Sequence, residues 1–140
     1  MGYNYGEPLS DKYGLLEFYG RDSIDLLARM IFSEARGESW KGKQAVAHVA
    51  KNRKKHPSDF GDTYEKVLLD PGQFKGMDKL DARKPDTSLQ SWHDSLYIAQ
   101  NIDSQYNPIG NRLYFGTSYP SRATDVIQIG NHYFYNMKWI

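Results

Sequence analysis

Residues 26–53, LLARMIFSEARGESWKGKQAVAHVAKNR, carry two helical patterns separated by a glycine, and this pair decides the fold. The first pattern spaces its apolar residues by three, four and seven positions, the spacing of one buried helix face. These residues are Ile24, Leu27, Ala28 and Ile31. Asp22 or Ser23 can cap the helix at its start, and Gly37 is expected to end it.

The second pattern predicts a helix from about Lys41 to Lys54, which Pro57 stops. The inward face of this helix is expected to consist of Ala45, Val46, Val49 and Ala50. Because the alanine side chain is small, we expect a neighbouring helix to approach this face closely. Asn52 and Arg53, near the end of the helix, are expected to tie it to its surroundings.

Glu34 falls in the last turn of the first helix, within about a quadrant of the centre of the apolar face. Its neighbours one turn back are Met30 and Ile31, so part of the carboxyl group should be shielded from water. Shielding and the negative end of the helix dipole both raise a carboxyl pKa. A carboxyl that stays protonated near neutral pH can act as the general acid in glycosidic bond cleavage.

A structural interpretation of Glu34 is also open at this point. Helix-end carboxylates are common, and Glu34 could form a salt bridge with Arg36, Arg53 or Lys41. Glu38 follows the helix-breaking glycine, where a capping or salt-bridge role is typical. Periodicity alone does not decide between an acid and a surface ion pair.

Further helices are predicted after the central pair. A short helix is expected around Thr63–Leu69, an exposed loop over residues 75–85, and then a longer helix capped by Asp86 or Thr87. The apolar side of the longer helix is expected to be Leu89, Trp92, Leu96 and Ala99.

The helical period disappears after Asn101, and short aromatic runs follow. RLYFGT (112–117) and NHYFYN (131–136) are typical of strands, and the turn-rich segment SYPSRATD (118–125) separates them. Helices first and strands last predict an α+β fold, mainly helical, with a small C-terminal antiparallel sheet. We expect one domain over residues 21–140, preceded by an irregular N-terminal leader over 1–20.

The composition excludes several classes of protein. A chain of 140 residues, 39 % hydrophobic and 25 % charged, is typical of one globular domain. No apolar run is long enough to span a membrane, and the N-terminus lacks the segments of a secretory signal. A net charge of +1 gives no general attraction to nucleic acid. Because cysteine is absent and the histidines show no ligand spacing, we expect no metal and no cofactor.

Four blocks of sequence together resemble the SleB/CwlJ family of bacterial cell-wall hydrolases, which includes spore-cortex-lytic enzymes. The blocks are LLARMIFSEARGESWKGKQAVAHVAKNR (26–53), PGQF (71–74), LYF (113–115) and IGNHYFY (129–135). Their order and spacing match the family. The resemblance implies a lysozyme-like fold and cleavage of peptidoglycan between N-acetylmuramic acid and N-acetylglucosamine.

The resemblance also assigns chemistry. The first glutamate of the family block is the catalytic acid of the family, and that position here is Glu34. Some members are associated with lytic transglycosylation, which needs no second protein carboxylate, whereas retaining or inverting hydrolysis does. The possible second carboxylates have no supporting spacing, so transglycosylation is the favoured hypothesis. They are Glu38, Asp62, Asp78 and Asp81.

The remaining family blocks are expected to line the glycan cleft. The candidate substrate-binding residues are Gln73, Phe74, Tyr114, Phe115 and His132. Gln73 could form hydrogen bonds with N-acetyl or hydroxyl groups, and the aromatic rings could stack on sugars. Ordinary core packing is the alternative for the rings, and a hydrogen-bonded position in the sheet is the alternative for His132.

One segment departs from the family pattern. Family members often carry a threonine and a Gly-Ala pair before the aromatic block, where this chain reads NPIGNRLYF, with Ile109, Asn111 and Arg112. If the family threonine contacts substrate, this chain lacks that hydroxyl. The preference among glycan substrates is therefore open.

Two functions from different classes remain. The first is a peptidoglycan-cleaving glycosidase, acting as a lytic transglycosylase. The second is a non-catalytic glycan-binding accessory protein of a spore or phage particle. Either would be a monomer that binds peptidoglycan strands at the cell wall or the spore cortex or coat. A phage lysin, or a domain trimmed from a secreted protein, would equally lack a visible signal.

Overall fold

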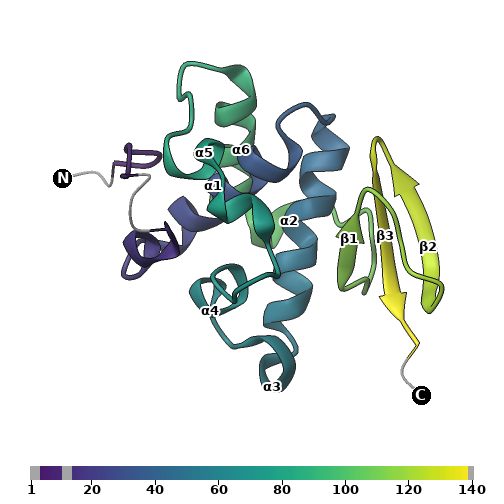
Figure 1. Ribbon diagram of the computed structural model, residues 1–140. Coiled ribbons are helices and arrows are strands. Elements are labelled where there is room, and N and C mark those ends of the chain that lie inside the picture. The colour runs from purple at the N-terminus through teal and green to yellow at the C-terminus, as the bar shows by residue number, and fades with distance from the viewer. Residues whose placement is uncertain (1–3, 11–13, 139–140) are drawn as a thin grey trace.

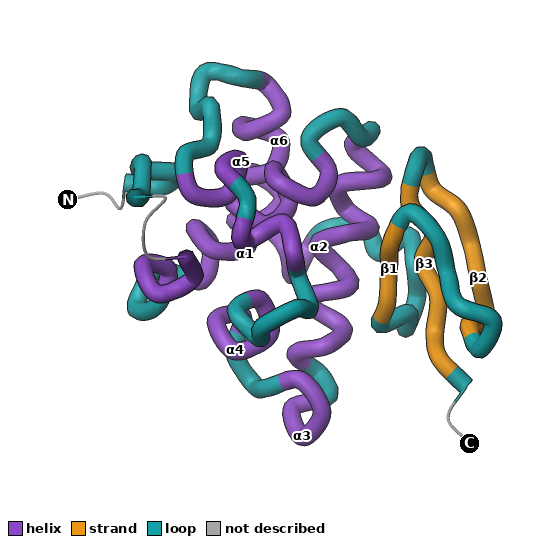
Figure 2. The backbone as a smooth tube through the Cα atoms, in the orientation of Figure 1, coloured by secondary structure: helices purple, strands orange, loops and turns teal. Residues whose placement is uncertain are grey.

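The computed structural model describes residues 4–10 and 14–138. Figure 1 shows a group of helices, with α2 beside a small sheet at one side of the molecule. Figure 2 shows the strands of the described chain following the helices, toward the C-terminus. The predicted α+β class with a small C-terminal antiparallel sheet is confirmed. Residues 1–3 and 11–13 of the predicted leader lie outside the described residues.

The described helices and strands follow one another in the predicted order, helices before sheet. The helices are η1 (Gly14–Phe18), α1 (Ser23–Ala35), α2 (Trp40–Lys54), α3 (Pro57–Phe60), α4 (Tyr64–Leu68), η2 (Lys75–Asp78), α5 (Leu80–Arg83), α6 (Gln90–Gln100) and η3 (Ile102–Ser104). The strands are β1 (Tyr114–Gly116), β2 (Ala123–Ile129) and β3 (His132–Met137). None of the described helices combines the length and the apolar character that a membrane span requires.

Helix α1 begins where the sequence predicts. Asp22 is its N-cap residue, and the Asp22 side chain accepts a hydrogen bond from the Ile24 backbone N–H at 2.7 Å. Leu27, Ala28 and Ile31 are buried, because α1 packs against α2, α4, α5 and α6. Helix α1 is therefore a core helix whose last turn carries Glu34.

Helix α2 starts at Trp40, one residue before the predicted start, and Ser39 is its cap. The Ser39 hydroxyl oxygen accepts a hydrogen bond from the Gly42 backbone N–H at 3.1 Å. The predicted inward face is confirmed, since its four residues are buried. They are Ala45, Val46, Val49 and Ala50.

The far end of α2 is bonded to the segment that enters the sheet. Asn52 Nδ2 donates to the carbonyl oxygens of Gly110 at 2.9 Å and Arg112 at 2.8 Å. Arg53 Nε donates to the carbonyl oxygen of Leu113 at 2.8 Å. These bonds hold β1 against α2, so the expected structural role of both side chains is confirmed.

Residues 75–85 form two short helices, η2 and α5, and the expectation of an exposed loop there is wrong. Met77 and Ala82 are fully buried. Arg29 of α1 donates a hydrogen bond to the Ala82 carbonyl oxygen at 2.8 Å. Because each short helix buries so little apolar surface, no helical period is visible in this charged segment.

Helix α6 begins at Gln90, later than the predicted caps, and Leu89 is its N-cap residue. Asp86 instead accepts hydrogen bonds from the Ser88 backbone N–H at 3.1 Å and the Ser88 hydroxyl at 2.6 Å. This local turn uses the Asp86 side chain before the helix starts.

The sheet has the strand order β1-β3-β2, and both pairs are antiparallel. Strand β2 is absent from the predicted elements, and its first residues lie in the segment interpreted as a turn. The pairing register shifts between Thr124 and Ile127, and Asp125 has a positive φ of 55°. This irregularity interrupts the alternation of side chains, which explains why the sequence pattern gives no strand here.

A buried ion pair within α1 forms hydrogen bonds with the backbone of residues 4–10 and holds this segment against the helices. The side chains of Asp25 and Arg29 are both fully buried, with 2.7 Å between Oδ2 and Nε. Asp25 also accepts a hydrogen bond from the Gly6 backbone N–H at 2.7 Å, and Arg29 donates to the Glu7 carbonyl oxygen at 2.6 Å. The pair therefore satisfies its charges partly with the backbone of the N-terminal segment.

Candidate active site

Glu34 lines an open cleft of about 430 Å³. Three parts of the chain border this cleft: the end of α1, the segment 73–79, and the strands β1 and β3 with the loop after β1. The lining residues are Glu34, Gln73, Lys75, Lys79, Phe115, Gly116, Thr117, Ser118, His132 and Tyr135. Of the predicted substrate-binding residues, Gln73, Phe115 and His132 thus share the cleft with Glu34.

Burial raises the pKa of the Glu34 carboxyl above the ordinary glutamate value. Two weaker effects oppose this shift: a hydrogen bond from the Gly76 backbone and the positive charge of Lys79. Because desolvation is the largest effect, the protonated form persists to a higher pH than in an exposed glutamate. The alternative salt bridges do not form among the described residues, since Arg36 pairs with Asp81 and Arg53 bonds elsewhere.

The last turn of α1 also fixes the opposite wall of the cleft. The Ser33 hydroxyl donates a hydrogen bond to the Gly76 carbonyl oxygen at 2.7 Å. The backbone N–H of the same glycine bonds to Glu34. Both polar groups of Gly76 are therefore held by adjacent residues of α1, which ties η2 to the turn that carries the acid.

Glu38 is engaged with the hairpin between β2 and β3. One Glu38 carboxylate oxygen accepts a hydrogen bond from the Asn131 backbone N–H, and the other accepts from Asn131 Nδ2, each at 3.1 Å. Lys43 Nζ donates to the Glu38 carbonyl oxygen at 2.6 Å. These contacts give Glu38 a structural role, joining the turn between α1 and α2 to the sheet.

The other possible second carboxylates also lie outside the lining of the cleft. Asp62 pairs with Lys66 at 3.0 Å, and Asp81 pairs with Arg36 at 3.1 Å. Within the described chain, Glu34 is therefore the one carboxylate among the lining residues.

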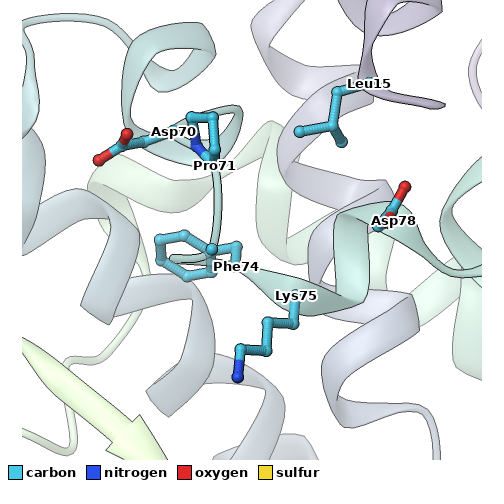
Figure 3. Close-up of a pocket in the computed structure, with 7 residues that line it drawn as sticks. Leu15, Asp70, Pro71, Phe74, Lys75 and Asp78 are labelled. Carbon is cyan, nitrogen blue, oxygen red and sulfur yellow. The ribbon is translucent and has the colours of Figure 1, made fainter.

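Asp78 borders a second cavity of about 370 Å³ and forms an ion pair with Arg83. Figure 3 shows Asp70 and Asp78 at opposite sides of this cavity, with their carboxyl groups pointing away from each other. Phe74 and Lys75 lie below them in the same view. Two carboxylates that diverge in this way do not form an acid–base pair across a bound sugar.

Arg53 orients Gln73. The Arg53 side chain is buried, and one of its terminal nitrogens donates to Gln73 Oε1 at 3.1 Å. Since a guanidinium has donors and no acceptor, the Gln73 oxygen must face Arg53. The Gln73 amide nitrogen is then free to donate to a ligand in the cleft.

The aromatic residues form two adjoining stacks. Phe74 is buried, its ring centroid lies 5.8 Å from that of Phe115, and Phe115 stacks on Phe134 at 6.0 Å. Tyr114 stacks on Tyr135 at 5.8 Å. Of these rings, Phe115 and Tyr135 line the cleft. Phe74 lies behind Phe115, and Tyr114 borders a separate cavity with Phe60.

His132 is packed edge-on against Phe115, with 5.4 Å between the ring centroids. Burial lowers the pKa of His132, and the charge of Glu38 acts weakly in the opposite direction. Its Nδ1 is buried and has no hydrogen-bond partner among the described residues. The same described residues contain no group of three or more acidic, histidine or cysteine side chains arranged to hold a metal ion.

Several lining residues are absent from the predicted site. They are Lys75, Lys79, Gly116, Thr117, Ser118 and Tyr135. The two lysines lie in the segment interpreted as an exposed loop, and nothing in its composition distinguishes them from solvent-facing lysines. Tyr135 follows His132 in the same aromatic run, so only the strand register could reveal that it also reaches the cleft.

The departure at position 109 lies in the core. Ile109 is fully buried, and its backbone N–H donates to Asn107 Oδ1 at 2.9 Å. Ile109 is not among the residues that line the cleft with Glu34. An isoleucine here therefore adds apolar contacts inside the domain, and it does not change the lining of the cleft.

Comparison with known structures gives two similar catalytic domains. The catalytic domain of the germination-specific lytic transglycosylase SleB from Bacillus anthracis is 28 % identical, with a TM-score of 0.61 over 84 % of this chain and 98 % of that domain. The catalytic domain of the Bacillus cereus SleB protein is 27 % identical, with a TM-score of 0.64 over 84 % and 94 %.

Sequence comparison gives longer relatives, which are spore cortex-lytic enzymes. A spore cortex-lytic enzyme of Oceanobacillus iheyensis is 29 % identical over 126 residues, which is 83 % of this chain and 42 % of the relative. A spore cortex-lytic enzyme of Bacillus cereus is 30 % identical over 124 residues, 83 % of this chain and 45 % of the relative. The chain thus spans less than half the length of these relatives.

A family model described as Cell Wall Hydrolase matches residues 37–135. The match covers α2, the segment of Gln73, and the whole sheet up to Tyr135. The match begins after Glu34 and does not include it. By this match, together with the two similar catalytic domains, the chain belongs to the cell wall hydrolase family.

Proposed function

We propose that this protein cleaves peptidoglycan glycan strands between N-acetylmuramic acid and N-acetylglucosamine, with Glu34 as the general acid. The observation that carries the proposal is the position of Glu34, half-buried at the wall of the cleft with a raised pKa. A glycosidic oxygen is a poor leaving group until it is protonated, and a carboxyl that keeps its proton can supply that proton.

The reaction begins with a glycan strand lying along the cleft and the bridging oxygen next to Glu34. Glu34 donates its proton to that oxygen as the bond breaks through an oxocarbenium-like transition state. The ionised Glu34 then accepts the proton of the C6 hydroxyl of the muramic residue, whose oxygen bonds to C1. The product is a 1,6-anhydro end, and Glu34 recovers its proton.

A transglycosylase is favoured over a hydrolase because the lining contains one carboxylate among the described residues. Hydrolysis with retention or inversion uses two carboxyl groups, about 5–5.5 Å or about 6.5–9.5 Å apart. The carboxylates considered as a second group are held in ion pairs or hydrogen bonds away from the cleft.

The candidate substrate contacts follow from the same cleft. We assign Gln73, through its amide nitrogen, to a carbonyl or hydroxyl oxygen of the sugar, and Phe115 and His132 to the wall beside the reacting residue. Phe74 and Tyr114 act from behind, since each packs on a ring that reaches the cleft. The protein works as a monomer on the cell wall or the spore cortex and coat.

The test is digestion of vegetative sacculi and of spore cortex, followed by mass spectrometry of the released muropeptides. We expect anhydro-muramic ends from the wild type and no release from Glu34→Gln, which keeps the shape of the side chain. Retained binding of insoluble peptidoglycan by Glu34→Gln would show that the cleft is intact. A wild type that binds both polymers and releases nothing would instead identify a glycan-binding accessory protein.

A further inference from the structure

Two lysines lie in the cleft beside Glu34. Lys75 is the first residue of η2, and Lys79 directly follows this helix. Both side chains are exposed. Neither ammonium group forms an ion pair with the acidic side chains that the structure describes, whereas Arg83, from the next helix, pairs with Asp78. Figure 3 shows the Lys75 side chain running away from the carboxyl groups of Asp70 and Asp78.

These lysines give the cleft an uncompensated positive charge. When Glu34 is protonated, Lys75 and Lys79 are the charged side chains among the lining residues, because burial keeps His132 neutral at pH 7. Two positive charges therefore face one cleft, in a chain whose net charge is only +1. Such a concentration attracts an anionic group to this wall.

The charge of Lys79 also opposes the protonation of Glu34. This charge favours the ionised form of Glu34 and so opposes the effect of burial. An anion bound to Lys79 would cancel that charge and leave the Gly76 hydrogen bond as the remaining effect that opposes the desolvation of Glu34. A ligand carboxylate would therefore make the proton of Glu34 more available for transfer at the moment when the substrate is in place.

We propose that Lys75 and Lys79, with the hydroxyls of Thr117 and Ser118, form a subsite for a carboxylate of the peptide stem carried by the muramic residue. This inference rests on the proposed function. The amino-sugar backbone bears no charge, so the carboxylates of a peptidoglycan strand belong to its stems. Lysine is a flexible point charge, which suits a group that hangs from the glycan without a fixed orientation.

The test compares cleavage of one glycan preparation with its stem carboxylates free and after their conversion to amides by a carbodiimide and ammonia, because amidase removal of the stems would expose the lactyl carboxylate of the muramic residue. An exposed ammonium–carboxylate contact changes affinity by up to about fivefold. At low salt we therefore expect kcat/KM to be about 2- to 25-fold higher on strands with free stem carboxylates. This ratio should fall toward one in Lys75→Gln/Lys79→Gln, and also in the wild type at about 0.5 M salt.

A matched control removes the same charge elsewhere. Lys41 and Lys138 are exposed and do not line the cleft, so Lys41→Gln/Lys138→Gln should keep the wild-type ratio. Using the ratio matters because Lys79→Gln also changes the field at Glu34, and the ratio isolates the part of the effect that depends on the stem carboxylate. A ratio near one for the wild type, or an unchanged ratio in the cleft variant, would overturn the subsite.

Two further measurements identify the recognised anion and distinguish failure of the subsite from failure of the proposed function. Removal of wall phosphodiester polymers with hydrofluoric acid should leave the ratio unchanged, and a collapse of the ratio would show that phosphate is the recognised anion. If no preparation is cleaved by the wild type, the proposed function fails and the subsite with it. If both preparations are cleaved equally, only the subsite fails.

Discussion

Gly76 lies so close to Glu34 that a β-carbon at position 76 would be 2.7 Å from both Cδ and Oε1 of the Glu34 carboxyl. Real β-carbons essentially never make contacts this short, so any side chain here would force the Glu34 side chain to move. The close approach brings a backbone N–H to the acid and covers part of it from water. Burial of Glu34, which raises its pKa, therefore depends on the absence of a side chain at position 76.

Gly76→Ala should inactivate the enzyme with little loss of stability. The added methyl group must displace the Glu34 side chain, and a misplaced catalytic group costs about 100-fold in rate. The backbone at position 76 does not have a positive φ, so alanine brings no conformational strain. We expect kcat to fall about 100-fold and the free energy of unfolding to change by less than about 3 kcal/mol, measured by muropeptide release and urea unfolding.

Gly37→Ala is the matched control for this substitution. It lies just after α1, and no atom lies within 4 Å of the β-carbon that it would add. Its activity should stay within about twofold of the wild type, since a surface substitution has a small effect. If both variants lost activity equally, the spatial conflict with Glu34 would not be the cause.

Activity should fall as the pH rises through the pKa of Glu34. The acid must hold its proton before the bond breaks, and burial moves that pKa above the ordinary glutamate value. Lys79→Gln removes a charge that lowers this pKa, so its alkaline limb should move to higher pH. A pH profile of kcat/KM on strands with amidated stem carboxylates measures the limb of each enzyme. An unmoved limb would show that another group controls it.

The same pKa predicts a pH dependence of stability. An acid whose pKa is raised by folding binds more protons in the folded state, so its contribution to stability is present below the unfolded pKa. This contribution is lost as the pH rises through the folded pKa. The free energy of unfolding of the wild type should therefore decrease relative to that of Glu34→Gln across this range. Urea unfolding at several pH values would reveal the opposite slope if the Glu34 pKa were lowered.

Much of this structure can be predicted from local patterns in the sequence. The apolar residues of α1 recur at helical spacing. The same spacing places Glu34 beside buried residues, so its partial burial can be predicted. The cap Asp22 and the inward alanines of α2 are local in the same sense. The parts that escape prediction depend on partners distant in the chain.

Lys79 illustrates what the sequence alone does not reveal. It lies in a charged segment with Asp78 and Asp81. Its place beside Glu34 arises because Ser33 and Arg29 bond to the backbone of 76–83. Strand β2 is hidden for a different reason, since the shifted register at Thr124 removes its period. In both cases the missing information is a contact between distant segments, and no window of sequence contains it.

Gln73→Leu should weaken substrate binding and also cost some stability. Gln73 is exposed, and its amide nitrogen is left free by the bond from Arg53. Loss of one hydrogen bond to substrate should raise KM about 5- to 10-fold, because such a bond contributes about 1 kcal/mol. The free energy of unfolding should fall by about 1–3 kcal/mol, because buried Arg53 loses the Gln73 oxygen as an acceptor.

Arg53→Lys is the companion variant that should affect both properties. A lysine cannot donate to Leu113 and Gln73 at once in the geometry of the guanidinium, nor lie flat on the surrounding rings. We expect a loss of stability of about 2–4 kcal/mol and a raised KM. If Gln73→Leu left KM unchanged, Gln73 would not contact substrate and Arg53 would act only in the fold.

Gly6→Ala should destabilise the attachment of the N-terminal segment. Gly6 has a φ of +77°, and its β-carbon would lie 2.6 Å from the Trp92 ring. Gly20→Ala is the matched control, because its φ is +85° but no atom lies within 4 Å. Both variants carry a backbone cost of about 1 kcal/mol, and Gly6→Ala adds a steric cost of about 1–3 kcal/mol. Equal melting temperatures of the two variants would show that residues 4–10 can move away from Trp92 without loss of stability.

Glu38→Gln distinguishes the two mechanisms of cleavage. Both carboxylate oxygens of Glu38 accept hydrogen bonds from Asn131, so the amide of glutamine turns an NH₂ group toward a donor. The expected cost is about 1–3 kcal/mol in unfolding free energy, with anhydro products still released at a rate within about tenfold of the wild type. A second carboxylate of a hydrolase would behave differently, because its loss removes the nucleophile or base. Two results together would contradict transglycosylation: reducing ends in the wild-type digest, and a fall of more than about 1,000-fold in the cleavage rate of Glu38→Gln. They would identify the enzyme as a hydrolase with Glu38 as its second carboxylate.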